Sequence, residues 1–236
     1  MLLRIGNYVC KPLKKMSKSQ CFVTADRKYF IKQTDQQIYV ENETNLLNHI
    51  DMYGHMRFHY MRPVIPIYET FKHRQSHYIV YPYLDGFDLQ QKKFNINIWM
   101  GILKCIKYIH MNNIVHCDLK PENFMYYMNN IYLCDFELGH KLNDKDDKKL
   151  INYRFGTLSY IAPEVYNRQF VTLKSDIFSL GRMYYISRTG DYNFDYKNNK
   201  WISEDERDII SMMTHKDINK RIDIYDCINY FEYIMC

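Results

Sequence analysis

Alternating apolar and polar residues predict β structure in the first third of the chain. Between Gln20 and Lys32, two apolar runs flank a polar stretch at residues 24–27, a pattern typical of a β-hairpin and its turn. Lys32 is expected to end the second strand. Two further strand-like runs extend from Pro66 to Phe71 and from His77 to Pro82. The region up to Pro82 is therefore expected to be rich in β structure.

A helix is predicted between Gln36 and Ile50, because apolar residues recur there at helical spacing. Glu43 precedes the last three of these apolar positions by three, four and seven residues, so its carboxylate is expected on the apolar face. A buried carboxylate needs a partner to offset its lost hydration, and Lys32 is the obvious candidate. Alternatively, Glu43 extends to solvent and Lys32 is a surface residue. The apolar positions are Ile38, Leu46, Leu47 and Ile50.

The second half of the chain is predicted to be mainly helical. Long apolar periodicity is found at residues 96–111, 175–188, 203–213 and 224–234. A β-rich first part and a helical remainder favour an α+β fold of two lobes around a cleft. At 236 residues the chain is expected to be one functional unit, with an N-lobe at residues 1–82 and a C-lobe, including the connection, at residues 83–236.

Composition excludes several classes of function. The net charge of +5 is spread along the chain, so nucleic acid is not expected as a partner. No apolar run approaches the roughly 20 residues that span a bilayer, so no membrane association is expected and the protein is predicted to be intracellular, in the cytoplasm. The seven cysteines are scattered without a Cys-x-x-Cys pair, which disfavours a zinc site or a disulfide framework.

The densest chemical signal is the segment from Ile114 to Gly139, IVHCDLKPENFMYYMNNIYLCDFELG. It resembles the catalytic loop and the metal-binding motif of eukaryotic protein kinases, whose usual forms are H-R-D-L-x-x-x-N and D-F-G. The matches GTLSYIAPE at 156–164, DIFSLG at 176–181 and NKRI at 219–222 follow in the order of the family. The chain is therefore identified as a compact, divergent member of the protein kinase superfamily, with a β-rich N-lobe and a mainly helical C-lobe.

This resemblance implies a task for each matched residue of the catalytic segment. Asp118 is expected to orient the substrate hydroxyl and accept its proton, and Lys120 to contact the γ-phosphate of ATP. Asn123 and Asp135 are expected to hold Mg²⁺, or Mn²⁺, because hard cations prefer oxygen ligands. Phosphoryl transfer needs mainly in-line positioning and neutralisation of charge, which these side chains supply.

The resemblance also implies a nucleotide site between the lobes. Ile31-Lys32 matches the end of V-A-I-K, and Glu43 matches the helix glutamate that pairs with that lysine. Tyr81 takes the place at the back of the adenine site. The residues expected to bind the nucleotide are Val23, Lys32, Glu43, Pro82, Tyr83, Leu84, Asn123 and Asp135.

Two positions point to the serine/threonine branch of the family. Lys120 in LKPEN and Thr157 in GTLSYIAPE are typical of that branch, and both are expected at the catalytic centre. The implied partner is a protein substrate with a Ser or Thr acceptor, while the oligomeric state is left open. Glu164 and Arg221 are expected to form a structural ion pair. Asp176 is expected to anchor the catalytic loop.

The first lobe departs from the family pattern in two places. No glycine lies between residues 7 and 53, so the Gly-rich loop that covers the phosphates is absent from its expected place at residues 16–23. Lys14, Lys15 and Lys18 either compensate for it electrostatically or form a solvated basic loop. Phe30 occupies the Ala position of V-A-I-K and is expected on the cleft-facing side with Lys32. Its ring either crowds the adenine site or is accommodated by a local twist of the strand or a shifted nucleotide.

The second lobe carries two further substitutions. Glu137 replaces the Gly of D-F-G, which adds negative charge beside a metal ligand and is expected to affect loop switching more than metal ligation. Cys117 replaces the Arg of H-R-D, so regulation through an activation-loop phosphate is not expected. After Gly181 there is little room for the usual extra helix and substrate-docking surface. This compactness is typical of a small genome, such as that of a large DNA virus or an intracellular parasite.

Three functions remain open from the sequence. The first is an active serine/threonine kinase, favoured because all the motif residues with a chemical task are retained together. The second is a pseudokinase that acts as a decoy, scaffold or allosteric partner, favoured by the missing glycines, Phe30 and Glu137. The third is a small-molecule phosphotransferase, which Lys120 and the Ala162-Pro163-Glu164 segment argue against.

Overall fold

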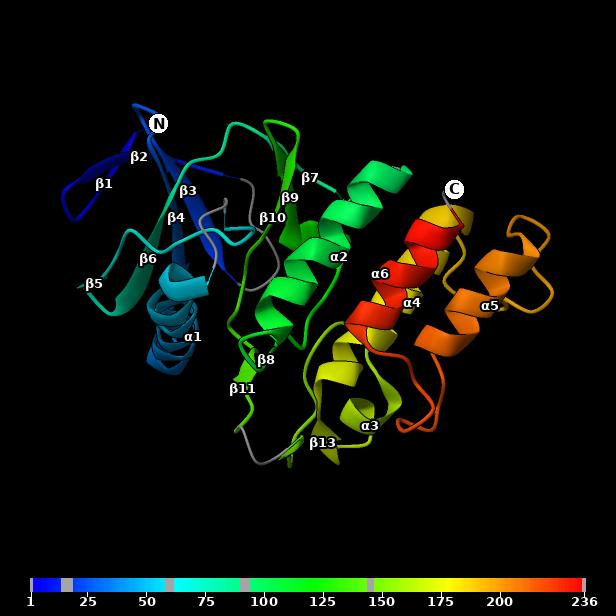
Figure 1. Cartoon of the computed structure of the whole chain (residues 1–236). Helices are drawn as coiled ribbons and strands as arrows, with labels where there is room; N and C mark the ends of the chain where they lie inside the picture. Colours follow the sequence, from blue (N-terminus) through cyan, green and yellow to red (C-terminus); the bar gives the residue numbers. More distant parts are fainter. Residues whose placement is uncertain (1, 14–18, 58–61, 90–93, 144–146, 235–236) are drawn as a thin grey trace.

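The fold has a β-sheet lobe and a helical lobe, joined near residue 83 (Figure 1). The computed structural model describes residues 2–13, 19–57, 62–89, 94–143 and 147–234, with the main chain alone at residues 51–57 and 87. This arrangement is the bilobal α+β fold that the sequence predicts. Among the described residues, we find no helix with the length and apolar character needed to cross a bilayer.

An antiparallel sheet forms the first lobe, with its strands in the order β1-β2-β3-β4-β6-β5. The predicted hairpin at residues 20–32 is confirmed as β3 and β4, and Asp26 organises its turn by accepting hydrogen bonds from the Thr24 hydroxyl and the Lys28 amide. Lys32 does not end the strand, because pairing with β6 continues to Thr34. The strands are β1 (Leu3–Ile5), β2 (Tyr8–Pro12), β3 (Gln20–Thr24), β4 (Tyr29–Thr34), β5 (Glu69–His73) and β6 (Ser76–Pro82).

The hairpin of β1 and β2 folds back onto the opposite edge of the sheet. Gly6 turns between the two strands with a φ of +55°, a conformation in which glycine is not strained. The ring of Tyr8 then stacks on Phe71 of β5, with 5.9 Å between centroids, and its hydroxyl bonds to Glu69. Residues at both edges of the sheet therefore share one small core.

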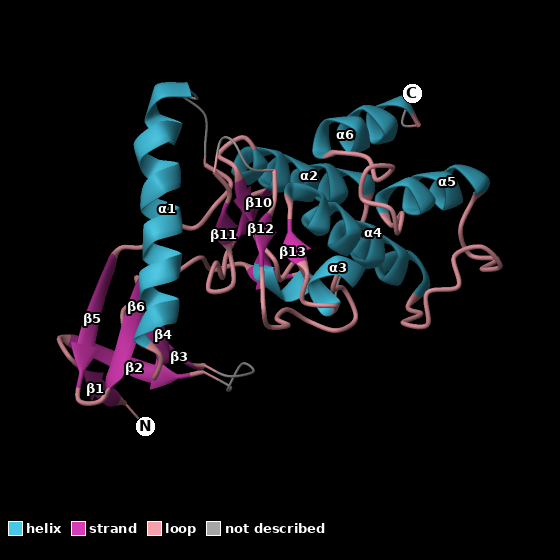
Figure 2. Ribbon diagram, turned by 90° about the horizontal axis from the view of Figure 1, so that it is seen from below, coloured by secondary structure: helices cyan, strands magenta, loops and turns pink. Residues whose placement is uncertain are grey.

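Helix α1 (Gln37–Arg57) packs against the sheet and extends toward the helical lobe (Figure 2). The predicted apolar face is confirmed at Leu46, Leu47 and Ile50, which are all buried. The prediction for Ile38 is wrong, because this side chain is 63% exposed. Val40, two positions later and on the opposite side of the first turn, packs into the core instead.

The segment before β5 runs beside the helical lobe rather than forming a strand in the sheet. A strand was expected from Pro66, but β5 begins at Glu69. The residues before it run beside the other lobe, where Ile65 donates a hydrogen bond to Leu133 and Leu133 donates one to Pro63. Pro66 lacks the N–H that a paired strand position needs.

The helices of the second lobe confirm the predicted segments, with ends that differ by at most two residues. Polar side chains cap the starts of four of them: Asn95, Thr172, Ser203 and Asp223 each accept a hydrogen bond from the first turn. The helices are α2 (Ile96–His110), α3 (Pro163–Tyr166), α4 (Leu173–Thr189), α5 (Glu204–Met213) and α6 (Ile224–Tyr233).

The core of the helical lobe is built around α2. Trp99 is fully buried between Tyr184 of α4 and Phe231 of α6, with 4.8 and 5.6 Å between ring centroids. This packing fixes three helices relative to one another and gives the loops at the lobe junction a rigid base.

Short strands at the lobe junction carry those loops. The hairpin of β9 and β10 lies beside the segment before β5, where Val64 pairs with Leu133, and β11 pairs with β8. These strands are β7 (Phe87–Asp88), β8 (Ile114–Val115), β9 (Phe124–Tyr127), β10 (Asn130–Leu133) and β11 (His140–Lys141), with a 3₁₀ turn at Pro121–Asn123. The strands β12 (Lys149–Leu150) and β13 (Phe170–Val171) pair with each other beside α3.

Candidate active site

A buried carboxylate on α4 holds the loop that follows β8. Asp176 is fully buried, and its two carboxylate oxygens accept hydrogen bonds from the main-chain amides of His116, at 2.8 Å, and Cys117, at 3.0 Å. His110 of α2 lies 3.1 Å from the same carboxylate. The predicted anchoring of this loop by Asp176 is therefore confirmed by its contacts.

The loop places Asp118, Lys120, Asn123 and Thr157 together. The Asp118 carboxylate lies 2.6 Å from Lys120 Nζ and accepts a 2.7 Å hydrogen bond from the Thr157 hydroxyl. Asn123 donates a hydrogen bond to the carbonyl oxygen of Asp118, at 2.8 Å. Burial alone would lower the pKa of Lys120, but Asp118 outweighs it and the pKa is raised, so the ammonium is kept charged.

A second cluster surrounds the amine of Lys32. Its Nζ lies 2.7 Å from Asp135 Oδ1, 2.9 Å from Glu137 Oε1 and 3.5 Å from Glu43 Oε2. The other oxygen of Glu43 accepts a hydrogen bond from the amide of Phe136, at 3.0 Å. The predicted partnership of Lys32 and Glu43 is present, and both side chains are buried. The alternative of a solvent-exposed pair is therefore wrong.

Lys32 and Asp135 stabilise each other in their charged forms. Burial works against a charged Lys32, but Glu43 and then Asp135 outweigh it, and the pKa of Lys32 lies well above its ordinary value. Burial also opposes ionisation of Asp135, yet Lys32 outweighs it and lowers the pKa of that carboxyl. For Glu43 burial dominates, and the pKa is raised.

The two clusters belong to one network. The amide of Cys134, just before Asp135, donates to the carbonyl oxygen of Asn123 at 3.0 Å. The carbonyl oxygen of Cys134 lies 3.1 Å from His116 Nε2, in the loop that carries Asp118. Residues from both lobes and from two separate loops therefore meet in one place.

Sequence reasoning missed Asn42, which fixes the loop after Asp135. Its side-chain amide donates to the carbonyl oxygens of Glu137, at 2.9 Å, and Gly139, at 3.0 Å, with a weaker contact to Phe136 at 3.4 Å. Together with Glu43, the next residue along α1, it binds both the N–H and the C=O groups of this loop. The signal was its position beside Glu43, which periodicity alone does not single out.

Apolar side chains flank the Lys32 cluster. Phe30 of β4 packs on Tyr81 of β6, with 6.1 Å between ring centroids, and both join a core with Leu84 and Val40. Phe30 therefore packs with Tyr81 and Leu84, next to residues that are predicted to bind the nucleotide. Val23 is buried on β3, where it pairs with Phe30.

In the connection between the lobes, the main-chain N–H of one residue that is predicted to bind the nucleotide is already hydrogen-bonded. The amide of Tyr83 donates to the carbonyl oxygen of Lys28 at 2.8 Å, so that N–H is used in pairing with the sheet. Pro82, at the end of β6, has no N–H to donate. Leu84 packs against the core beside them. The basic residues Lys14, Lys15 and Lys18 lie outside the described residues.

The two substitutions in the second lobe have clear positions. Cys117 is half-buried, desolvation raises the pKa of its thiol well above the ordinary value, and its Sγ lies 3.8 Å from His140 Nδ1. Glu137 turns its carboxylate toward Lys32. The carboxylates of Glu43, Asp135 and Glu137 come within 4.8 Å of one another, a donor set that suits a hard divalent cation. Glu137 therefore lies beside Asp135, which the sequence predicts to be a metal ligand.

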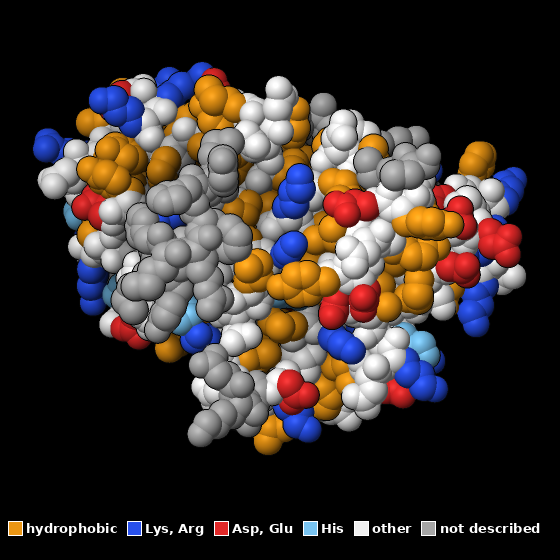
Figure 3. Space-filling model, viewed as in Figure 1, with side chains coloured by type: hydrophobic (Ala, Val, Ile, Leu, Met, Phe, Trp, Pro, Cys, Tyr) orange, Lys and Arg blue, Asp and Glu red, His pale blue; other side chains and the backbone are white. Residues whose placement is uncertain are grey.

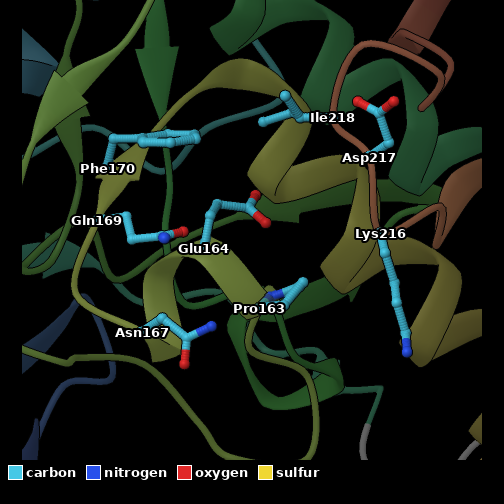
Figure 4. Close-up of a pocket in the computed structure, with 8 residues that line it drawn as sticks. All are labelled: Pro163, Glu164, Asn167, Gln169, Phe170, Lys216, Asp217 and Ile218. Atoms are coloured by element: carbon cyan, nitrogen blue, oxygen red, sulfur yellow. The ribbon is translucent and has the colours of Figure 1, made fainter.

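A separate cavity of about 330 Å³ lies in the helical lobe (Figure 4). Phe170 and Ile218 lie on one side of it and Pro163 and Asn167 on the other, with Glu164 between them. Its lining contains none of the residues expected to bind substrate or nucleotide. The carboxylate of Glu164 is held by Arg221 at 2.7 and 3.1 Å, so the predicted structural ion pair is confirmed.

The surface of the described residues mixes charges of both signs. Figure 3 shows acidic and basic side chains interspersed with apolar ones on the face that Figure 1 presents.

The six cysteines within the described residues are free thiols.

A sheet lobe and a helical lobe that bring a lysine and several carboxylates together at their junction define a kinase-like fold. A protein-family model described as "Protein kinase domain" matches residues 18–231. The chain therefore belongs to the protein kinase family.

Curated relatives agree with this assignment. The chain is 25% identical over 223 residues to "Myosin light chain kinase 3" of Rattus norvegicus, and 25% identical over 232 residues to the protein of that name from Homo sapiens. These alignments cover 81% and 85% of this chain. The chain spans only 27% of the length of either relative.

Proposed function

We propose that the protein is a serine/threonine protein kinase that transfers the γ-phosphate of ATP to Ser or Thr hydroxyls of protein substrates. One observation carries the proposal: the retained motif residues from both lobes form two clusters that belong to one hydrogen-bonded network, although they are far apart in sequence. They are Lys32, Glu43, Asp118, Lys120, Asn123 and Asp135.

Asp118 is the proposed catalytic base. Its carboxylate accepts a hydrogen bond from the Thr157 hydroxyl at 2.7 Å, which supports its ability to receive a hydroxyl proton. Lys120, at 2.6 Å from the same carboxylate, is placed to neutralise charge on the transferring phosphoryl group. Thr157 bridges the two side chains, since Lys120 Nζ lies 3.4 Å from its hydroxyl.

Asn123 and Asp135 would hold Mg²⁺, with Mn²⁺ as an alternative. An amide oxygen and a carboxylate suit a hard cation, and a bound ion supplies neutralisation of phosphate charge. Asn123 is buried and fixed by its bond to Asp118, while Asp135 is kept ionised by Lys32. Both ligands are therefore held in place by residues that share the proposed chemistry.

The ATP itself is proposed to lie between Lys32 and the apolar side chains next to the lobe connection. Lys32 would contact the phosphates while Glu43 holds its amine in place. The adenine would pack near Val23 and Leu84, beside Pro82 and Tyr83. Because the main-chain N–H of Tyr83 already donates to Lys28, only the carbonyl oxygen and the side chain of Tyr83 would contact the nucleotide.

The choice of Ser or Thr over Tyr as acceptor rests on Lys120 and Thr157, which occupy the positions typical of that branch. The name of the curated relatives refers to a protein substrate, and this supports a protein acceptor here. We also propose that the protein acts in the cytoplasm, which would be that of the host cell if the source is a virus.

The test is transfer of labelled γ-phosphate to a generic basic protein and to Ser- and Thr-containing peptides, with Mg²⁺ or Mn²⁺. Asp118→Asn should lower the rate by about 10²–10⁴-fold, the usual contribution of a general base. Asp208→Asn, at an exposed position of α5, is the matched control and should keep the wild-type rate. Unchanged transfer by Asp118→Asn, or no transfer by the wild type, would contradict the proposal.

The second candidate is a pseudokinase, and it is favoured by the contact of Lys32 with Glu137. A ligand that binds only the native state stabilises it, by about 2.7 kcal/mol at a concentration of 100 times its Kd. The melting temperature rises as a result. A melting temperature that does not change with Mg-ATP, together with no phosphate transfer, would favour this candidate.

A further inference from the structure

The amine of Lys32 is enclosed by carboxylates in the present structure. An ammonium group has three N–H donors, and three carboxylates lie within 3.5 Å of this one. The Lys32 side chain is only 10% exposed, so water has little access to it. An incoming phosphate oxygen must therefore take the place of one carboxylate.

The three carboxylates are not held equally. Glu43 is fully buried and its second oxygen is fixed by the amide of Phe136. Asp135 makes an aligned hydrogen bond to Lys32 at 2.7 Å. Glu137 is close enough for an ion pair, at 2.9 Å, but its buried Oε1 has no aligned hydrogen-bond donor. Glu137 is therefore the carboxylate that a competing anion displaces most easily.

We propose that Glu137 is a tethered competitor of the nucleotide phosphates, which occupies Lys32 and thereby lowers the affinity of the site for ATP and ADP. This inference rests on the proposed nucleotide-binding role of Lys32. A carboxylate and a phosphate oxygen carry the same sign of charge and seek the same ammonium group. The backbone of Glu137 is fixed by Asn42, so only its side chain has to move when the nucleotide binds.

The effect of removing this charge is large enough to measure. Two like charges about 4 Å apart at a partly buried site interact strongly, and part of this repulsion is relieved when the side chain turns to solvent. We expect Glu137→Gln to lower the Kd for ADP by about tenfold or more. The gain is expected in the absence of divalent metal, where no cation can bridge carboxylates and phosphates.

The experiment is a titration of the full chain with a fluorescent ADP analogue, in EDTA and in Mg²⁺. Glu137→Gln keeps the size of the side chain, and Glu137→Gly, the usual residue of the motif, guards against a Gln amide that still blocks the site. Glu41→Gln, on the exposed side of α1, is the matched control for loss of one negative charge. Urea unfolding of each variant reports whether it is folded.

The outcomes separate the inference from the proposed function. In EDTA, tighter ADP binding by both Glu137 variants than by the wild type, with Glu41→Gln binding like the wild type, supports the inference. Equal or weaker binding by the Glu137 variants, with measurable binding by the wild type, overturns the inference alone. An absence of binding by every variant in both buffers overturns the nucleotide site as well.

Discussion

Replacing Asn42 by alanine should loosen the loop that carries Asp135. The side-chain amide has two N–H groups, and the short contacts to Glu137 and Gly139 use both of them. A net hydrogen bond contributes about 0.5–1.5 kcal/mol to stability, so the pair contributes about 1–3 kcal/mol. Asn42 is only half-buried and water can replace part of the lost bonding, which places the expected value in the lower half of that range.

The same free energy sets how often the loop opens. Every 1.4 kcal/mol is a factor of ten in an equilibrium constant, so a loss of about 1–2 kcal/mol raises the open population by roughly 5–30-fold. Hydrogen exchange of the main-chain amides at residues 136–142 measures this directly. The amide of Phe136, which bonds to Glu43, should exchange faster in Asn42→Ala than in the wild type.

Asn45→Ala is the matched control, since Asn45 lies on the same helix with an exposed side chain. It removes an identical side chain and changes helix propensity by the same amount. If exchange at residues 136–142 is the same in both variants, the three carbonyl contacts of Asn42 do not hold the loop and the reasoning is wrong.

Two further predictions concern the helical lobe. Arg221→Met leaves the buried Glu164 carboxylate without its main partner, and urea unfolding should show a loss of about 3–5 kcal/mol. Adding Glu164→Gln should restore part of it, and a double variant as unstable as the single one would contradict the ion pair. Burial lowers the pKa of His140 in the folded state, so the unfolded chain binds protons more readily and stability should fall as the pH drops below about 6.5. His140→Phe, which keeps a ring stacked on Phe155, should flatten the pH dependence between pH 7 and 5, and an unchanged slope would refute this origin.

Local pattern was enough for the helices and the central hairpin. The segment at α2 has buried residues on nearly every turn and an Asn cap before it, so period and start signal agree. The pairing of Lys32 with Glu43 followed from one physical requirement, that a carboxylate on an apolar helix face needs a cation. Both arguments use residues that are close in sequence.

Features that depend on distant contacts were not predictable in this way. The hairpin of β1 and β2 is held by Tyr8 against Phe71, more than sixty residues away. Ile38 was assigned to the apolar face of α1, but it is exposed, and Val40 on the other side of the first turn packs into the core. The reach of Glu137 to Lys32 depends on the path of the main chain at Asp135, whose φ is +69°. No periodicity or motif encodes that path.

The residues that depart from the family pattern are expected to affect nucleotide binding, whereas the retained residues are expected to affect the chemical step. In the nucleotide site that we propose, Glu137 contacts Lys32 and Phe30 lies beside the adenine, so both would oppose entry of the nucleotide. The groups proposed for the chemistry, Asp118 and Lys120, lie in the other cluster, where Asp176 fixes the main chain of the loop and Thr157 fixes the carboxylate. A change that weakens substrate binding without altering the reacting groups raises KM and leaves kcat intact. A working enzyme with a high requirement for ATP is therefore the form of kinase that this arrangement of charges favours.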